Sequence, residues 1–507
     1  MAPSLSRRRF LTVAGAGAVG VAALGSADIL LDRAPRASAS TVNQFGRMFP
    51  SLPPFAPASD AVKAALADIG KVGGLMDAKD PLNQGAEALA ENQAFSNNNL
   101  DNTTHTAGTT YFGQFVDHDL TLDNTTQPGV PSPLPANGRT TALDLDSLYG
   151  GGPSASPALY NPADMAKFKV GFGGRFEDLP RQPNNVAIVG DARNDENLIL
   201  GGLTAGYLLF HNKVVDRLRS QGVPNSQVFA QARQLVTWHY QWVIVHEFLP
   251  QIIGWAMWQN IQQSGRQVYR PEPGPAFMPV EFAGAAYRFG HSQVRPSYLV
   301  NSTGDNGQEF YAFIFDASQS GSDPGDLRGG VRAPRRYVDW PFFFEFFSGT
   351  PIRWNKRIDT RISTPILNLT MPTLPGGTGP TSIATRDLLR HLTYGLPSGQ
   401  AVARAIGAQV LGPDRFRELA PYGLGFDANT PLWYYILREA DQMTGALSLG
   451  TVGGRIVGET IFGILQLDPT SYLNQPNWKH TLPARVQGQF TQADLLNFAG
   501  VGPANRH

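Results

Sequence analysis

The sequence predicts a mainly α-helical protein with long irregular loops and little β-structure. Three features support this fold class. Apolar residues recur at helical spacing over several long segments, most clearly over 197–219. No segment of comparable length alternates between apolar and polar side chains, as a half-buried strand does. The 507 residues also include 54 glycines and 39 prolines, which favour loops between the helices.

Composition restricts the class of protein further. Lysine and arginine total 41, as do aspartate and glutamate, so the chain lacks the basic excess typical of nucleic-acid-binding proteins. Hydrophobic residues make up 42%, which is enough for a sizeable core. The absence of cysteine excludes disulfides, thiolate nucleophiles and iron–sulfur clusters. No internal repeat or change in composition marks a second domain, so residues 40–507 are expected to form one large domain.

The first 39 residues are expected to be an export signal and not part of the fold. Arg7 and Arg8 precede an apolar, Gly/Ala-rich run, and the small residues at 37–39 suit signal peptidase. This pattern is typical of a twin-arginine signal, and an N-terminal membrane anchor is the alternative. No later segment is expected to span a membrane, which takes about 18 apolar residues. We therefore expect a periplasmic or extracellular protein.

Periodicity and helix-boundary residues predict the elements in chain order. Residues 40–110 are expected to hold short helices and an extended arm, and 301–335 are expected to be a loop. The second of two long helices is expected to stop at Pro250. The predicted helices cover 111–121, 197–219, 227–249, 279–289, the aromatic block 339–347, 383–393, 398–407, 413–419, 431–444 and 451–465.

Two polar motifs stand out before residue 150. The run GQFVDHD at 113–119 places three ionisable residues on an otherwise apolar helix, which is costly in a core. By itself it could also be a solvated helix end. Thr140, Ala142, Asp144 and Asp146 offer oxygen atoms at every second position, which suits a hard cation such as calcium. A solvated acidic loop is the alternative.

Two further motifs follow. In GDARNDEN at 190–197 the acidic residues could cap the next helix, but capping does not explain Arg193 at the positive end of the helix dipole. In YRFGHS at 287–292, His291 closes an apolar segment, where a lone histidine is often only a favourable dipole partner. The remaining histidines, including His239 and His246, and the aromatic block are interpreted as ordinary core or surface residues.

Together, in this order, GQFVDHDLT, TALDLDSLYGG, GDARNDEN and YRFGHS resemble the animal haem peroxidase family, also called the peroxidase–cyclooxygenase superfamily. The dipeptides at 211–212 and 339–340 and the segment GLPSGQ at 395–400 extend the resemblance to roughly residues 95–465. The chain is most similar to the shorter bacterial members. The resemblance implies a single helical haem-peroxidase domain that binds haem b and calcium.

The resemblance also implies residue roles around the haem. His118 corresponds to the distal histidine that moves the peroxide proton, and Arg193 to the distal arginine that stabilises the departing oxygen. Gln114 corresponds to a distal glutamine that hydrogen-bonds pocket water or a halide. His291 corresponds to the proximal ligand of the haem iron.

Other positions correspond to haem-anchoring and calcium-binding residues of the family. Asp117 and Glu196 match the carboxylates that form ester bonds to haem, and Arg288 matches an arginine that pairs with a haem propionate. The calcium ligands implied by the resemblance are Asp119, Thr140, the Ala142 carbonyl, Asp144 and Asp146.

The chain departs from the family at two important positions. Asp387 stands where the family usually has an asparagine bonded to the proximal histidine. A carboxylate there would lower the iron reduction potential, so a weaker oxidant towards halides is expected. Asn197 stands where the strongest halide oxidisers carry a haem-linked methionine, so no sulfonium bond can form.

The function that the resemblance implies is a secreted peroxidase. It would use hydrogen peroxide to form a ferryl haem and then oxidise a halide, a pseudohalide or a phenolic or organic donor. The alternatives are a haem-dependent fatty-acid dioxygenase of the same superfamily and a calcium-stabilised adhesion scaffold without catalysis. A dioxygenase requires a tyrosine three residues before the proximal histidine, but Arg288 occupies that position and Tyr287 is four before. The scaffold is disfavoured because His118, Arg193 and His291 are all present.

Overall fold

The computed structural model describes residues 43–95, 97–173, 176–330, 333, 335–369 and 379–505. By its internal contacts the chain divides into two units, Met1–Thr41 and Val42–His507, and the described residues all belong to the second. The predicted export signal at 1–39 lies outside the described residues.

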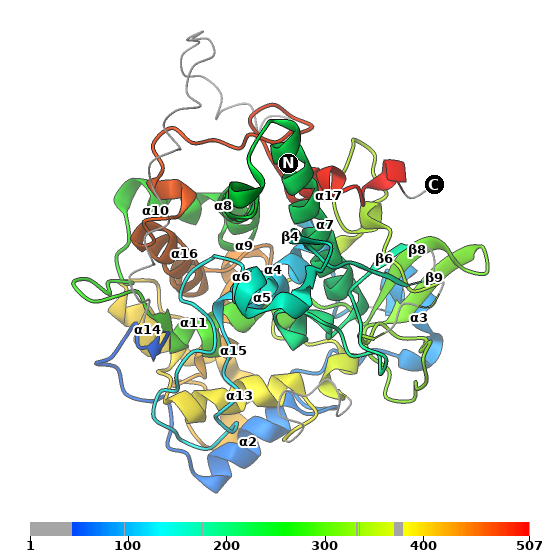
Figure 1. Ribbon diagram of the computed structural model, residues 1–507. Coiled ribbons are helices and arrows are strands. Elements are labelled where there is room, and N and C mark those ends of the chain that lie inside the picture. The colour runs from blue at the N-terminus through cyan, green and yellow to red at the C-terminus, as the bar shows by residue number, and fades with distance from the viewer. Residues whose placement is uncertain are drawn as a thin grey trace. The chain divides into compact units, whose positions relative to one another are not determined.

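The second unit is mainly α-helical, as the sequence predicts (Figure 1). Its α-helices are α2 (Asp60–Gly70), α3 (Ala86–Glu91), α4 (Gly108–Leu120), α5 (Asp146–Tyr149), α6 (Gly152–Ala155), α7 (Leu198–Ser220), α8 (Asn225–Val243), α9 (Leu249–Ile253), α10 (Trp255–Ser264), α11 (Val280–Gly284), α12 (Gly290–Gln293), α13 (Ile383–Tyr394), α14 (Gly399–Ala405), α15 (Leu432–Thr444), α16 (Thr451–Leu467) and α17 (Gln492–Ala499). A π-helical turn, η6 (Ile244–Phe248), joins α8 to α9. The 3₁₀ turns are η2 (Leu82–Gln84), η3 (Gln93–Phe95), η4 (Pro157–Leu159), η5 (Ala192–Asp195), η7 (Ala286–Phe289), η8 (Trp340–Phe342), η9 (Thr364–Leu367), η12 (Pro413–Tyr422), η13 (Tyr472–Asn474) and η14 (Pro503–Asn505).

The strands of the described residues form two-stranded sheets. β1 (Phe45–Gly46) pairs in parallel with β7 (Met278–Pro279). The antiparallel pairs are β2 (Asp101–Thr106) with β10 (Trp354–Lys356), β3 (Tyr160–Asn161) with β4 (Asp164–Phe168), β5 (Gly171–Gly173) with β6 (Phe176–Asp178), and β8 (Ser297–Asp305) with β9 (Gln308–Phe313).

Most predicted helices are present with shifted ends, but four predictions are wrong. The β8–β9 hairpin replaces the start of the expected loop at 301–335. Its turn is Asn306–Gly307, and both residues have the positive φ angles that a tight hairpin requires. The helix expected to stop at Pro250 continues through η6 and α9 to Ile253. Proline is tolerated there because it lies in the first turn of α9, where its missing N–H group costs little.

Two other predicted helices are broken. The segment expected to be one helix over 279–289 splits into α11 and η7, because Ala285 adopts a non-helical conformation between them. The aromatic residues of the block at 339–347 are buried as predicted except for the exposed Phe347, but only η8 within the block is helical. The non-helical backbone of this block contacts another element, because the carbonyl of Phe343 accepts a hydrogen bond from the backbone N–H of Gly108 at the start of α4.

α7 is mostly buried and packs against α4, α8 and α17 (Figure 1). Asn197 caps its N-terminus, since its side chain accepts a hydrogen bond from the backbone N–H of Leu200 at 2.8 Å. The ring of Tyr207 stacks on Phe115 of α4 at a centroid distance of 4.5 Å. Among the described helices, α7 is long and apolar enough to cross a membrane, although the sequence analysis expected none. Because 83% of its most apolar window is buried inside the protein, core packing accounts for its composition.

Candidate active site

Helix α4 places four of the predicted residues on two of its faces. Gln114 and His118 are four positions apart and therefore project from the same face. Asp117 and Asp119 flank His118 and are buried, as is almost every residue of this helix. The sequence analysis noted that three ionisable groups are costly to bury in an apolar helix. In the structure each of these three groups has a polar partner.

His118 is held as a neutral base. Its Nδ1 lies 2.9 Å from Oδ1 of Asn194, so Nδ1 carries the proton and donates it to the amide oxygen. Burial, together with the positive charge of Arg193, lowers the pKa of His118 to about 4. Nε2 is thus a free proton acceptor at neutral pH, and the nearest carboxylate oxygen, Oε2 of Glu196, is 4.0 Å away. Asn194 was missed in the sequence, although it lies next to Arg193 in a motif already singled out.

Arg193 is fixed beside the helix that bears His118. It lies in η5, whose N-cap Asp191 accepts a hydrogen bond from the Arg193 backbone N–H at 2.9 Å. Its guanidinium also binds the Asp191 carboxylate, with Nη2 at 2.7 Å from Oδ2, and donates to the carbonyl of His118 at 3.2 Å. Burial alone would raise the pKa of Asp191, but the ion pair with Arg193 outweighs it and holds the pKa well below its usual range. Asp191 is therefore a charged anchor for Arg193.

Gln114, Glu196 and Asn197 form a third contact between α4 and the start of α7. Gln114 donates through Nε2 to Oε2 of Glu196 at 3.1 Å. Asn197, the cap of α7, donates to Oε1 of Gln114 at 3.0 Å. Burial raises the pKa of Glu196 to about 7. The carboxyl group of Glu196 therefore changes charge near neutral pH, a few ångströms from the free nitrogen of His118.

The segment around His291 lies against the same helix. Nδ1 of His291 is 2.5 Å from Oδ2 of Asp387, which α13 presents in its second turn. Nε2 of His291 has no hydrogen-bond partner among the described residues. Arg288 donates to Oδ2 of Asp117 at 3.0 Å, and the Tyr287 hydroxyl donates to the carbonyl of Gly113 at 3.2 Å. Burial opposes ionisation of Asp117, but the charges of Arg288 and Arg193 prevail and lower its pKa.

These contacts fit the requirements of a histidine-ligated haem. A haem iron needs one imidazole with a free nitrogen and a fixed orientation, and His291 has an unpartnered Nε2 while Asp387 orients its ring. Peroxide chemistry needs a neutral base and a fixed cation near each other, and His118 and Arg193 meet that condition. The residues present are therefore suited to this cofactor.

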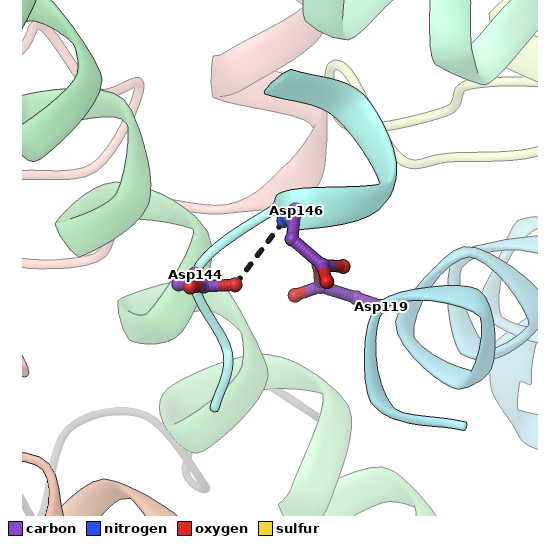
Figure 2. A group of neighbouring side chains, drawn as sticks. All are labelled: Asp119, Asp144 and Asp146. Atoms are coloured by element: carbon purple, nitrogen blue, oxygen red, sulfur yellow. Dashed lines mark hydrogen bonds between the residues drawn. The ribbon is translucent and has the colours of Figure 1, made fainter. Parts of the chain in front are cut away.

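Three of the predicted cation ligands converge in the structure (Figure 2). Asp119 from α4, Asp144 from the loop before α5 and Asp146 from α5 place carboxylate oxygens within 4.8 Å of one another. Burial raises the pKa of all three, and mutual repulsion raises those of Asp119 and Asp146 further, the latter to about 6. Oδ1 of Asp146 is buried without a hydrogen bond. A divalent cation would remove this repulsion and supply the missing partner.

The two other predicted ligands belong to the same loop. Thr140 donates its hydroxyl to Oδ1 of Asp144 at 2.8 Å and its backbone N–H to Oδ2 of Asp146 at 3.1 Å. Ala142, which lies between Thr140 and Asp144 in the sequence, is also buried. The backbone N–H of Leu145 donates to Asp119 at 3.1 Å, which ties this loop directly to α4 one residue beyond His118.

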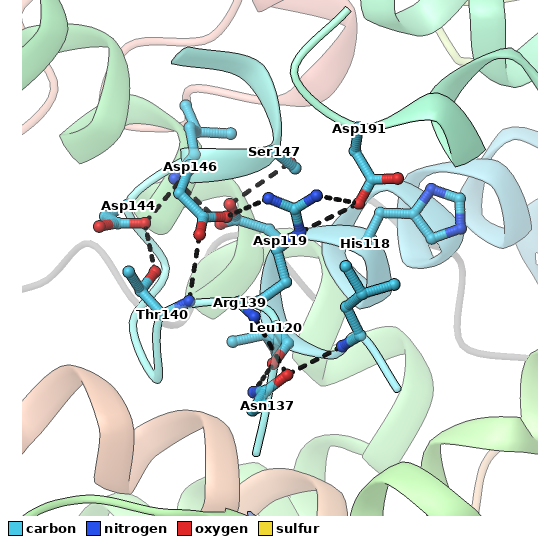
Figure 3. Close-up of polar contacts among 12 residues, drawn as sticks. His118, Asp119, Leu120, Asn137, Arg139, Thr140, Asp144, Asp146, Ser147 and Asp191 are labelled. Carbon is cyan, nitrogen blue, oxygen red and sulfur yellow. Dashed lines mark hydrogen bonds and ion pairs between the residues drawn. The ribbon is translucent and has the colours of Figure 1, made fainter. Parts of the chain in front are cut away.

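Arg139 links the carboxylate cluster to the Arg193 anchor (Figure 3). Its Nη1 lies 3.5 Å from Oδ1 of Asp146, while its Nε and Nη2 bind Oδ2 of Asp191 at 3.0 and 2.6 Å. Asp191 thus binds two guanidinium groups, those of Arg139 and Arg193. Sequence reasoning missed both Arg139 and Asp191, because nothing in the local pattern shows that residues 52 positions apart share an ion pair.

The fold is that of the helical haem peroxidases and dioxygenases. Peroxidase A from Dictyostelium discoideum aligns with a TM-score of 0.59 and 18% identity, over 86% of this chain and 89% of that one. A fatty acid α-dioxygenase from Oryza sativa aligns with a TM-score of 0.60 and 14% identity, over 92% of this chain and 81% of that one.

Sequence comparison finds the same resemblance over part of the chain. Residues 131–327 match the family model for animal haem peroxidases. Dual oxidase 1 from Caenorhabditis elegans is 31% identical over 127 residues, covering 24% of this chain and 8% of that protein. A peroxidase-like protein from Margaritifera margaritifera is 23% identical over 276 residues, covering 41% of this chain and 34% of that protein. The chain thus spans about a third or less of the length of these relatives. Over residues 131–327 the chain is thus similar to the animal haem peroxidase family, in agreement with the ordered motifs.

Proposed function

We propose that this protein is a peroxidase that uses hydrogen peroxide to oxidise a small donor. The observation that carries the proposal is the pairing of a neutral, oriented His118 with Arg193, on the helix that also contacts the segment of His291. Base, fixed cation and prospective iron ligand come from three segments far apart in sequence, and a purely structural role would not require all three.

In this proposal His291 would bind the haem iron through Nε2 and Arg288 would face a haem propionate. Haem, when bound, supplies the redox centre on which peroxide is cleaved. His118 accepts the first peroxide proton at Nε2 and returns it to the departing oxygen. Arg193 stabilises the negative charge on that oxygen, because Asp191 holds its guanidinium in place before the reaction begins. Gln114 orients water or a small anion beside His118.

Asp387 supports a preference for easily oxidised donors. A carboxylate on Nδ1 gives His291 anionic character, which stabilises ferric iron and lowers the reduction potential. We therefore propose phenolic or other organic donors, or a pseudohalide, ahead of chloride as the substrate class.

Calcium is proposed as the second cofactor. Five oxygen ligands would come from Asp119, Asp144, Asp146, the Thr140 hydroxyl and the Ala142 carbonyl. Water would complete the roughly six to eight oxygen ligands that calcium takes. Asp119 lies next to His118, so the bound cation would hold α4 in register with the 140s loop. Asp117 and Glu196 are proposed as ester links to the haem, and the export signal is proposed to direct the protein out of the cytoplasm.

The first experiment is the visible spectrum of the purified, haem-loaded protein, followed by rapid mixing with hydrogen peroxide. We expect the haem-loaded protein to show a Soret band, and we expect hydrogen peroxide to change this band during rapid mixing. His291→Ala should lose the band, and His480→Ala, which alters a histidine outside the site, should keep it. A normal Soret band in His291→Ala would contradict the ligand assignment, and a wild-type protein that takes up no haem would contradict the proposed function.

A fatty-acid dioxygenase is the second candidate, and Tyr287 is the observation that favours it. This buried tyrosine reaches α4 through its hydrogen bond to Gly113, next to Gln114. Oxygen uptake with palmitic acid as substrate separates the two functions. We expect no uptake; uptake that Tyr287→Phe abolishes would establish the dioxygenase instead.

A further inference from the structure

Arg139 lies between the carboxylate cluster and the residue that anchors Arg193. On one side it faces Asp146 of the carboxylate cluster, and on the other it binds Asp191, the anchor of Arg193 (Figure 3). The side chains of Arg139 and Asp191 are 12% and 4% exposed, so water screens this interaction only partly. A continuous series of charged contacts therefore runs from Asp146 to Arg193.

The charges along this series compete for Arg139. Oδ2 of Asp191 lies 2.6 Å from Arg139 and 2.7 Å from Arg193, so one carboxylate oxygen serves two guanidinium groups. Asp146 offers Arg139 a second carboxylate, whose Oδ1 has no hydrogen bond of its own. The position of Arg139 between Asp146 and Asp191 therefore determines how strongly Asp191 attracts Arg193.

A divalent cation among the three aspartates would change that competition. Two positive charges at Asp146 would repel Arg139 and would neutralise the carboxylate that attracts it. Arg139 would then be committed to Asp191. Without the cation, three clustered carboxylates draw the same guanidinium towards Asp146.

We propose that Arg139 is a positioning residue that couples cation occupancy at Asp119, Asp144 and Asp146 to the placement of Arg193 through Asp191. This inference rests on the proposed function, because it concerns the cation and haem sites of that proposal. Coupling of this kind is reciprocal: if calcium changes the affinity of the distal side for a ligand, that ligand changes the affinity for calcium by the same factor.

Calcium and cyanide are the two probes for the test. Cyanide binds ferric haem and gives up its proton on the distal side, so its affinity reports on His118 and Arg193 without turnover. In the wild-type protein we expect calcium to change the cyanide affinity roughly fivefold or more. Calcium titration of the cyanide complex and of the cyanide-free protein should give the same factor.

Arg139→Gln should abolish that coupling. It should also strengthen calcium binding roughly tenfold, because a positive charge beside the cluster is removed. The matched control is Arg233→Gln. Arg233 is a second arginine whose charge acts on Asp144, but its guanidinium lies over the ring of Tyr149 at 4.8 Å, and among the described residues it forms no hydrogen bond or ion pair with Asp191. This control should tighten calcium binding while leaving the coupling factor intact.

Arg139→Lys extends the test if the glutamine variant folds poorly. It keeps the charge but loses the two-pronged contact with Asp191, so the coupling should fall while calcium affinity stays near the wild-type value. Equal coupling factors in wild type, Arg139→Gln and Arg139→Lys would overturn the inference while leaving the peroxidase proposal untouched. Failure of the wild-type protein to bind haem or cyanide would instead contradict the proposed function, and calcium binding to the haem-free variants would still report the electrostatic effect of Arg139.

Discussion

Asp387 lies 2.5 Å from Nδ1 of His291, and this contact joins α13 to the segment that would carry the haem iron. Asp387 is buried, and Ser382 defines its position by capping α13 through a hydrogen bond from the backbone N–H of Thr385 at 3.1 Å. The two residues are 96 positions apart, so their contact is a property of the fold.

Replacing Asp387 with asparagine should raise the iron reduction potential. The variant keeps a hydrogen-bond acceptor for Nδ1 but removes the negative charge that gives His291 its anionic character. Spectroelectrochemical titration of the haem-loaded protein measures the change. The oxidation of iodide or bromide should rise relative to that of a phenol. An unchanged potential would mean that Asp387 does not act on His291 when haem is bound.

Removing the proposed base should slow the reaction with peroxide much more than it affects haem binding. His118→Ala should retain its Soret band but react with hydrogen peroxide about 10² to 10⁴ times more slowly in rapid mixing, since that is the usual contribution of a general base. Asn194→Ala should have a smaller effect, because it frees the ring without removing it. An unchanged rate in His118→Ala would exclude His118 as the base.

The pH profile of the same reaction should follow the lowered pKa of His118. The protonated imidazole cannot accept a proton, so the rate constant for the reaction with peroxide should fall as the pH drops through about 4. Above about pH 5, His118 should cause no further change in this rate constant. Burial raises the pKa of Glu196 to about 7, so in protein not yet treated with peroxide, where Glu196 carries no ester link, a second step near neutral pH belongs to Glu196. Glu196→Gln should remove that step and leave the acidic one. A single step near pH 6.5 in both proteins would contradict the buried, neutral state of His118.

Removing calcium should destabilise the protein. EDTA would leave Asp119, Asp144 and Asp146 facing one another, so the free energy of unfolding should fall by about 2.7 kcal/mol relative to protein saturated at one hundred times the dissociation constant. Thermal unfolding with and without calcium measures this change. Asp144→Asn should reduce the calcium-dependent part, while Asp216→Asn, at a surface ion pair with Lys167, should not. Equal stability with EDTA and with calcium would contradict the cation site.

Covalent attachment of haem can be tested by acid–acetone extraction. After treatment with peroxide, haem should resist extraction from the wild-type protein and from either Asp117→Asn or Glu196→Gln alone. The double variant should release it, because both ester-forming carboxylates are gone. Ready extraction from the wild-type protein would contradict the ester links without affecting the peroxidase proposal.

The local patterns of the sequence predicted a large part of the fold. Apolar residues at helical spacing marked α4, α7, α13, α15 and α16, because helices of a helical core bury one side and the periodicity records which side that is. The errors came where backbone geometry depends on distant partners. The break between α11 and η7 and the irregular aromatic block are of this kind, since Gly284 is packed against Tyr394 and the Phe343 carbonyl is used by α4. The β8–β9 hairpin is different, because its Asn-Gly turn was a readable signal that was missed.

For the site, the sequence by itself determined which residue types are available and in what order. The motifs around His118, Asp144, Arg193 and His291 carry the resemblance to the haem peroxidases, because each motif is a short run of residues that can be recognised from the local sequence. Only the tertiary structure decided what each group does to its neighbours: Asn194 selects the tautomer of His118, Asp387 holds His291, and Arg139 joins Asp146 to Asp191. The physical reason is that charge and hydrogen bonding act over a few ångströms of space, and the packing of helices, not their sequence positions, sets those distances.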